Sequence, residues 1–260
     1  MNIACLNLGY SIMSNIISGS EAMAVKKCQI NYPKNKGWYD SNKEISMCTF
    51  NAVQFLSDYD LFGVQEVNNK YKKVFIDTIK SSHQDKKFEF LSSCYHGNSS
   101  IITGYDRNVL GHGIQLTNNL KLSSDNDERA IQLIWFKKHS LLFINLHAPH
   151  NINLKKEIEK ICNNIKLLVK PSKIIMLGDF NDCEGKILNV SIDIFGMKLK
   201  VPLNNEVPTT CCSDVNYDYV GDYILTTDYD DKNVHFGLPL DYNREINLYS
   251  DHDPVVLLYF

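Results

Sequence analysis

Short apolar segments recur along the whole chain and are separated by polar stretches. Segments of this length and composition, rich in Ile, Val, Leu and Phe, are typical of buried β-strands. We therefore expect strands at residues 3–8, 61–67, 88–91, 100–103, 114–116, 130–136, 141–146, 173–177, 223–226 and 255–260. The last predicted strand reaches the final residue of the sequence.

A helical repeat appears between two of these segments. Apolar residues recur there at intervals of four and three, at Leu154, Ile158, Ile161, Ile165 and Leu168. This spacing places one apolar stripe on a helix, and Pro171 ends it. Residues 45–56 and 70–79 show a less regular helical pattern. Because strands and helices intermix along the entire length, the sequence predicts one α/β domain over residues 1–260.

Composition supports a globular protein with a substantial core. The chain has 260 residues, of which 44% are hydrophobic and 22% charged, enough to bury a core without help from disulfides. The net charge of −3 excludes the overall basic field of nonspecific nucleic-acid binders, although it leaves room for a local basic groove.

The first fourteen residues lack the basic start and long apolar core of a signal peptide, and no run is long enough to span a bilayer. We therefore expect an intracellular protein without a membrane anchor. Eight cysteines are scattered with no CxxC pair, which argues against a zinc site. We expect them to be reduced and mostly buried, although an even number leaves disulfides open.

Polar residues lie repeatedly at the ends of the predicted strands. Six such groups are Asn7, Gln65-Glu66, Asn145 with His147, Asp179 with Asn181, Asp222, and residues 250–253. One placement of this kind means little, whereas six suggest that strand ends converge on one cleft, where open α/β sheets bind ligands.

The stretch from Gly178 to Asp182 is the densest of these groups. Gly178 lets the chain turn directly after a buried strand, and two carboxylates and a carboxamide follow within four residues. Oxygen atoms held at a strand end suit a hard cation and a phosphate. We expect Phe180 to anchor the loop in the core and Asp182 to be a solvated turn residue.

The motifs LNL, QEV, NLHAP, GDFND, GDYIL and SDHDP follow one another between residues 5 and 254. Their order and separation resemble the endonuclease/exonuclease/phosphatase superfamily, which includes deoxyribonuclease I. This resemblance implies an α/β fold, a four-layered sandwich of two facing mixed β-sheets flanked by helices. It also implies metal-dependent cleavage of phosphate esters, usually with Mg²⁺ and with Mn²⁺ as a possible substitute.

By the same resemblance, Glu66 is the first metal ligand, because a Gln-Glu-Val segment carries the ligand in the superfamily. Asn7 assists that metal or a phosphate oxygen through its carboxamide, and Asp251 is a further ligand. Asn145 helps hold the edge of the site. The resemblance assigns no role to Asp253.

The resemblance also implies the residues that act on water and phosphate. Asp179 orients or deprotonates the attacking water, or binds a second metal, while Asn181 donates to a phosphate oxygen. His252 is the general base or a cation bound to the phosphate. A catalytic histidine needs an orienting carboxylate. Asp222 fits that role best, with Asp218 as the rival.

His147 resembles the second catalytic histidine of deoxyribonuclease I and would contact the phosphate or the leaving group. In that enzyme a glutamate pairs with this histidine, but near the matching position we find only Gly97. Many relatives place a phosphate-binding tyrosine in this region, for which Tyr95 and Tyr105 are both candidates. Arg129 resembles an arginine of several branches.

The substrate is the least determined part of the prediction. Residues 23–39 combine lysines with aromatic side chains, which suits the phosphates and bases of nucleic acid but also fits a solvated loop over a few core aromatics. We expect a DNA or RNA nuclease, with no obligate protein partner evident. One alternative is a phosphatase or phosphodiesterase acting on inositol phosphates or phospholipids. A remote alternative is an inactive module that binds nucleic acid or protein.

Overall fold

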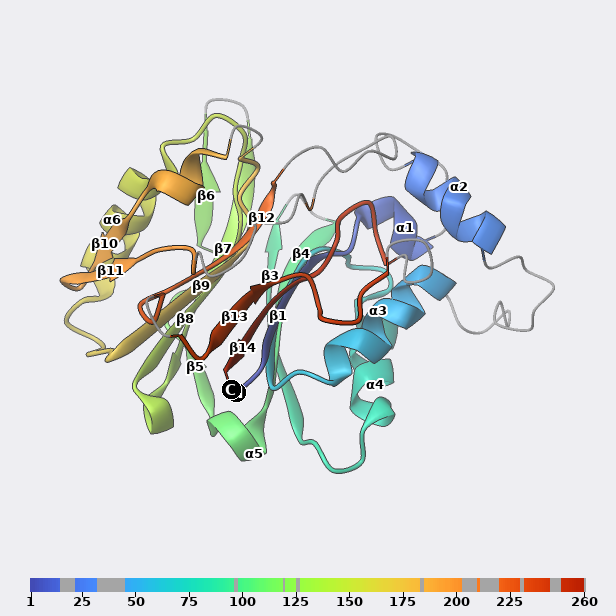
Figure 1. Ribbon diagram of the computed structural model, residues 1–260, viewed down its shortest axis with the longest axis horizontal. Helices are drawn as coiled ribbons and strands as arrows, with labels where there is room; N and C mark the ends of the chain where they lie inside the picture. Colours follow the sequence, from blue (N-terminus) through green and yellow to red (C-terminus); the bar gives the residue numbers. More distant parts are fainter. Residues whose placement is uncertain are drawn as a thin grey trace.

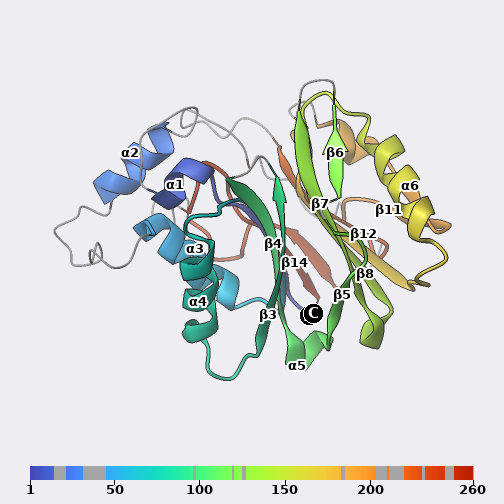
Figure 2. The same ribbon diagram turned by 180° about the vertical axis from the view of Figure 1, so that it is seen from behind.

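The computed structural model describes residues 1–14, 22–31, 45–95, 98–118, 120–124, 127–182, 185–202, 210, 220–229, 232–243 and 249–259. Two six-stranded sheets face each other, with helices on the outer side of each (Figures 1 and 2). The predicted four-layered α/β sandwich is therefore confirmed.

The first sheet contains the N-terminal half of the chain and its last strands. Its order is β13 (Val234–Gly237), β14 (Val255–Tyr259), β1 (Ile3–Asn7), β2 (Leu61–Asn68), β4 (Ser99–Asp106) and β3 (Phe88–Tyr95). The β1–β2 pair is parallel and the other pairs are antiparallel. Its outer side carries α1 (Tyr10–Ser14), α2 (Ala22–Asn31), α3 (Met47–Ser57) and α4 (Lys72–Ser82) (Figure 1).

The second sheet has the order β12 (Asp222–Thr226), β9 (Lys173–Asp179), β8 (Leu141–His147), β7 (Glu128–Phe136) and β5 (Gly113–Gln115), and β6 (Lys121–Ser123) also pairs with β7. Only β8 and β9 are parallel within this order. Outside it lie α6 (Leu154–Ile165) and the hairpin of β10 (Ile192–Ile194) and β11 (Met197–Leu199) (Figure 2). The short helices are α5 (Arg107–Leu110), η3 (Lys137–His139) and η4 (Lys186–Asn189).

Helix α6 shows how the apolar pattern becomes structure. Asn153 caps it by accepting a hydrogen bond from the Lys156 N–H at 3.2 Å. The predicted stripe is buried up to Ile165, and each such side chain contributes roughly 1.5–3 kcal/mol to folding. The helix ends there, so the prediction that Leu168 belongs to the stripe is wrong. Leu168 is exposed in the turn that leads to Pro171.

The weaker helical patterns are confirmed as α3 and α4, but several elements were not predicted. These are α1, α2, β6, β10, β11 and β13. Their apolar signals are sparse, and in α2 only Val25 and Cys28 are buried. No helix within the described ranges is long and apolar enough to cross a membrane.

A disulfide joins Cys28 of α2 to Cys48 of α3, with their Cα atoms 6.1 Å apart. The prediction that all the cysteines are reduced is therefore wrong for this pair. Both side chains are buried in a small apolar cluster with Ile12 and Val25, which lies outside the main core. The cross-link ties α2 to the helices that cover the first sheet. Cys5, Cys94 and Cys162 are free thiols, and the remaining three cysteines lie outside the described residues.

Candidate active site

Strand register places three predicted catalytic residues in a row across the second sheet. His147 at the end of β8 is paired with Asp179 at the end of β9, and Asp179 is paired with Asp222 at the start of β12. All three are buried. Residues in register on adjacent strands point to the same face, so a histidine and two carboxylates meet at one edge of the sandwich.

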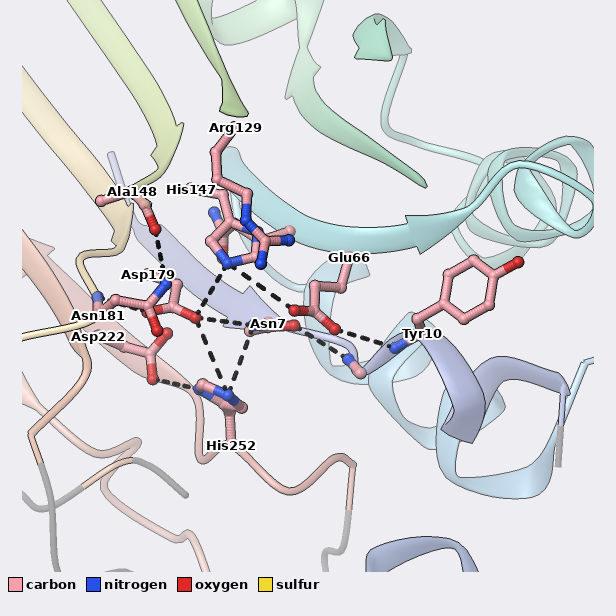
Figure 3. Close-up of polar contacts among 12 residues, drawn as sticks. Asn7, Tyr10, Glu66, Arg129, His147, Ala148, Asp179, Asn181, Asp222 and His252 are labelled. Carbon is pink, nitrogen blue, oxygen red and sulfur yellow. Dashed lines mark hydrogen bonds and ion pairs between the residues drawn. The ribbon is translucent and has the colours of Figure 1, made fainter. Parts of the chain in front are cut away.

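The first sheet supplies Asn7 and Glu66 to the same edge, from the ends of the parallel strands β1 and β2. Glu66 lies where the β2–β4 register shifts, and it has a left-handed backbone conformation with φ of 55°. Such a β-bulge re-aims side chains. Gln65 donates to Asn145 inside the protein at 2.8 Å, while Glu66 Oε2 accepts from the N–H of Tyr10 at 3.2 Å (Figure 3).

His252 enters from the loop before β14 and pairs with Asp222. Its Nδ1 lies 2.8 Å from Asp222 Oδ2, and its Nε2 lies 4.0 Å from Asp179 Oδ2 (Figure 3). The pairing of His252 with Asp222 matches the predicted orienting contact. The rival carboxylate, Asp218, lies outside the described residues. Asp222 is itself held by Thr210, whose hydroxyl accepts from the Asp222 N–H at 3.0 Å.

Asn7 connects the two sheets. Its Nδ2 donates to Asp179 Oδ2 at 2.9 Å and lies 3.4 Å from His252 Nε2. Its Oδ1 accepts from the N–H of Gly9 at 3.0 Å. Because a backbone N–H can only donate, the Gly9 contact sets the orientation of the amide. The amino group of Asn7 therefore faces the Asp179 carboxylate.

The Gly-Asp-Phe-Asn turn explains why the apolar strand ends as it does. A Cβ on Gly178 would lie 1.8 Å from the carbonyl oxygen of Leu146, so no other residue fits. Asn181 has φ of 48°, and its N–H donates to Asp179 Oδ1 at 2.8 Å. The Asn181 side chain donates to the carbonyl of Ala148 at 2.6 Å. The turn thus orients Asp179 through the Asn181 N–H and is tied to the segment after β8 through the Asn181 side chain.

Phe180 and Asp182, the neighbours of Asp179 and Asn181 in this turn, make structural contacts. Phe180 is buried in the main core against Tyr223, as predicted. Asp182 was predicted to be a solvated turn residue. It is partly exposed in a turn, but its side chain makes two contacts that were not predicted. Its Oδ2 accepts from the Ile187 N–H at 2.7 Å and from the Tyr223 hydroxyl at 3.1 Å. Asp182 therefore ties the loop to β12.

His147 has a partner that the sequence did not identify. The Tyr95 hydroxyl lies 2.9 Å from its Nδ1, and its Nε2 lies 3.6 Å from Asp179 Oδ2 and 3.8 Å from Glu66 Oε1. Arg129 lies over the Tyr95 ring, with Cζ 5.6 Å from the ring centroid. In the sequence, the only indication of this contact was that Tyr95 lies close to the position where a glutamate was expected.

Tyr105 and Asn145, two further candidates from the sequence, make structural contacts. The Tyr105 hydroxyl donates to Glu89 at 2.7 Å, in β4 at the end far from Glu66. Asn145 is fully buried, and it bonds both Gln65 and the carbonyl of Ile102. The contacts of Asn145 link the two sheets directly behind the site.

Asp251 and Asp253 lie on either side of His252 but differ in their surroundings. Asp251 is half-buried, and its Oδ1 accepts from Ser250 Oγ at 3.0 Å. Asp253 is fully buried, and its Oδ1 accepts from the Tyr242 hydroxyl at 2.7 Å. Asp251 is close enough for its charge to raise the pKa of Glu66 in addition to burial, and that of His252 in addition to Asp222, whereas Asp253 holds the loop that carries His252.

Carboxylates outnumber cations at this edge, and their pKa values show it. Burial, reinforced by the charge of Asp251, raises the pKa of Glu66. Burial and the neighbouring Asp222 raise the pKa of Asp179 to about 6. Both shifts come first from burial, which disfavours the ionised form, and then from the neighbouring carboxylates.

The two histidines differ in protonation. Burial alone would lower the pKa of His252, but the charge and hydrogen bond of Asp222, with Asp251 and Asp179, outweigh it and raise that pKa well above its ordinary value. Burial, followed by the charge of Arg129, lowers the pKa of His147 well below its ordinary value. These directions favour the protonated form of His252 and the neutral form of His147.

The donor set fits a hard divalent cation. The carboxylates of Glu66 and Asp251 are only partly buried. Mg²⁺ prefers one or two carboxylates together with water as ligands. Ligand atoms of Asp179, Asp222 and His252 also lie within 4.8 Å of one another. That second group is already engaged, because Asp222 pairs with His252 and Asp179 accepts from Asn7. We therefore favour the Glu66 side of the site for the cation.

Comparison with known proteins gives one clear result. No protein-family model and no curated protein matches the sequence, but solved structures match nearly the whole chain. An endonuclease/exonuclease/phosphatase family protein from Leptotrichia buccalis has a TM-score of 0.60 and 15% identity, covering 100% of this chain and 99% of that one. Truncated Caenorhabditis elegans TDP2 has a TM-score of 0.60 and 11% identity, covering 100% and 96%.

A mannosyl-6-phosphatase from Bacteroides thetaiotaomicron has a TM-score of 0.55 and 16% identity, covering 100% of this chain and 99% of that one. These identities are low, so the likeness concerns the fold. The chain has the fold of the endonuclease/exonuclease/phosphatase superfamily, as its motifs predicted.

Proposed function

We propose that the protein hydrolyses phosphate esters with the help of a divalent cation, Mg²⁺ or alternatively Mn²⁺. The observation that carries this proposal is the convergence of Asn7, Glu66, His147, Asp179, Asp222 and His252 from both sheets on one edge. The charge of this cluster is unbalanced without a further cation. None of the residues that the motifs require is replaced, which argues against an inactive binding module.

Glu66 and Asp251 would hold the cation. When bound, Mg²⁺ supplies positive charge that polarises the phosphate ester. Asn7 was predicted to assist the metal or a phosphate oxygen, and its contacts favour the phosphate side, because its amino group already faces Asp179 and His252.

Asp179 is the better of the two predicted groups for activating water. Its pKa of about 6 lets it accept a proton near neutral pH. His252 keeps its proton there, because Asp222 stabilises the imidazolium. His252 then acts as the cation that binds the phosphate, and Asp222 positions it. The reaction is an in-line displacement at phosphorus. The water oxygen forms the new P–O bond and passes its proton to Asp179, while the ester P–O bond breaks and the leaving oxygen takes a proton from water or from a protonated side chain.

Asn181 and His147 would carry the charge that develops on the phosphoryl oxygens. One N–H of the Asn181 amide is used by the carbonyl of Ala148, and the amide has a second. A preorganised donor of this kind contributes roughly 3–4 kcal/mol to transition-state stabilisation.

We propose nucleic acid as the substrate, with cleavage of a phosphodiester in DNA or RNA. Support comes from Lys26 and Lys27 on α2, a helix held against the covering helices by a disulfide. The remaining lysines and aromatics of residues 32–39 lie outside the described residues. A sugar-phosphate or inositol-phosphate monoester remains the rival class, since one structure of the same fold is described as a mannosyl-6-phosphatase.

The test is a hydrolysis panel of plasmid DNA, single-stranded RNA, an abasic duplex, an inositol phosphate and bis-p-nitrophenyl phosphate, with Mg²⁺ or with EDTA. Glu66→Gln should abolish turnover and also the thermal stabilisation by Mg²⁺. Glu89→Gln is the matched control, because this glutamate bonds Tyr105 at the far end of the sheet. Turnover that persists in EDTA, or Mg²⁺ binding unchanged in Glu66→Gln, would refute the proposal.

A further inference from the structure

Tyr95 and His147 face each other from different sheets. Tyr95 ends β3 and His147 ends β8, and both side chains are almost completely buried, with 2% and 1% exposed. Their rings meet edge to face, with centroids 5.6 Å apart and an angle of 88° between the planes. The hydroxyl lies 2.9 Å from Nδ1. Such a geometry leaves one proton to be placed between the two atoms.

Arg129 favours one placement of that proton. Its Nε donates to Asp127 at 2.9 Å, and its guanidinium lies over the Tyr95 ring with Cζ 5.6 Å from the centroid. Burial and the positive charge of Arg129 lower the pKa of His147 and so disfavour a second proton on that ring. The Tyr95 hydroxyl lies 2.9 Å from Nδ1 and can donate its proton to it.

The opposite side of the ring leads to the same tautomer independently. Nε2 of His147 faces two carboxylate oxygens, Asp179 Oδ2 at 3.6 Å and Glu66 Oε1 at 3.8 Å. An unprotonated Nε2 would turn a lone pair toward both acceptors, which is unfavourable in a buried site. A proton on Nε2 removes this conflict.

We propose that Tyr95, backed by Arg129, is a positioning residue that holds His147 as the Nε2–H tautomer, so that the ring donates a hydrogen bond into the site. A carboxylate in place of Tyr95 could only accept a hydrogen bond, so it would hold the ring with its proton on Nδ1. Nε2 would then be an acceptor and not a donor. The second histidine therefore serves here as a fixed donor to a phosphoryl oxygen. This catalytic role rests on the proposed function, but the tautomer itself does not.

The same contacts argue against direct phosphate binding by Tyr95. Its hydroxyl is already bonded to His147, and the side chain is buried with Arg129 over its ring. A substrate would have to break the bond to His147 to reach it. Tyr95 thus acts through His147.

Histidine ¹⁵N NMR on the metal-free protein tests the tautomer directly, with the signal assigned through His147→Gln. We expect His147 to show a protonated Nε2 and an unprotonated Nδ1 in the unsubstituted protein. Tyr95→Phe should shift both ring nitrogens of His147. Tyr105→Phe, which removes a buried hydroxyl bonded to Glu89 instead, should leave them unchanged. A protonated Nδ1 in the unsubstituted protein would overturn the assignment without any need for a folded variant.

Kinetics on the preferred substrate tests the catalytic consequence. Tyr95→Phe should lower kcat roughly 10- to 100-fold with little change in KM, the usual effect of removing an orienting partner. Arg129→Gln should lower kcat in the same direction, and Tyr105→Phe should not. Unchanged kcat in Tyr95→Phe would overturn the positioning role. Absence of any hydrolysis by the unsubstituted protein would instead refute the proposed function, and the NMR result would still decide the tautomer.

Discussion

Asn7, at the end of β1, donates a hydrogen bond to Asp179, at the end of β9 in the facing sheet, with 2.9 Å between Nδ2 and Oδ2. The two residues are 172 positions apart in the chain. This bond joins the two sheets at the edge where the predicted catalytic residues meet (Figure 3). It also stabilises the ionised form of Asp179, because it lowers a pKa that burial and Asp222 raise.

Removing that bond should impair catalysis. In Asn7→Ala, Asp179 loses a donor, so its pKa should rise further above about 6. We expect hydrolysis at pH 7 to fall roughly 10- to 100-fold, with the acidic limb of the pH–rate profile moved to higher pH. The measurement is kcat/KM against pH with Mg²⁺. An unmoved limb would show that Asp179 does not govern it.

The raised pKa of Asp179 also predicts how stability depends on pH. A carboxyl with a pKa of about 6 in the folded state and an ordinary pKa of 3.8 binds more protons when folded. Stability should therefore fall as pH rises from about 4 to about 6 in the metal-free protein. Asp179→Asn should remove this component, because an amide does not titrate.

Urea denaturation between pH 4 and 7 measures this component as the difference in slope between the two proteins. Because the charge of Asp179, after those of Asp222 and Asp251, also raises the pKa of His252, the difference includes that coupled contribution. Equal slopes for the two proteins would contradict the shift. Added Mg²⁺ should flatten the slope of the unsubstituted protein, since it stabilises the ionised carboxylates.

Gly178→Ala should be severely destabilising. A methyl group there would meet the carbonyl oxygen of Leu146 at 1.8 Å, and β8 and β9 would have to separate. We expect a loss of about 3 kcal/mol or more in the free energy of unfolding. Gly196→Ala is the matched control, because φ is also positive there but nothing lies within 4 Å of the added carbon. Similar losses in both variants would mean that φ alone is responsible.

The Cys28–Cys48 disulfide should stabilise the attachment of α2. It closes a loop with a sequence separation of 20, for which loop-closure entropy gives roughly 3 kcal/mol. Reduction should lower the midpoint of urea unfolding in the unsubstituted protein and have no effect on the Cys28→Ala/Cys48→Ala double variant. Mass spectrometry under native conditions should find these two thiols blocked. Alkylation of both in the folded, unreduced protein would contradict the bond.

The alternation of apolar segments and polar ends determined the fold class of this protein and the location of several site residues. Apolar runs such as residues 173–177 leave water only if they form buried strands. The polar residues that follow them must then lie at the edge of a sheet. Local pattern and motif order were therefore enough to predict the sandwich and to name Glu66, Asp179 and His252. Helix α2 escaped prediction because it buries so few side chains.

The contacts between sheets were decided by tertiary structure alone. Tyr95 meets His147 only because the end of β3 in one sheet faces the end of β8 in the other. The disulfide forms only because α2 packs beside α3. Apolar periodicity describes which face of an element is buried, but it carries no information on which residue of a distant element will lie opposite. Hydrogen-bond partners, tautomers and pKa values depend on those distances, so only the folded chain specifies them.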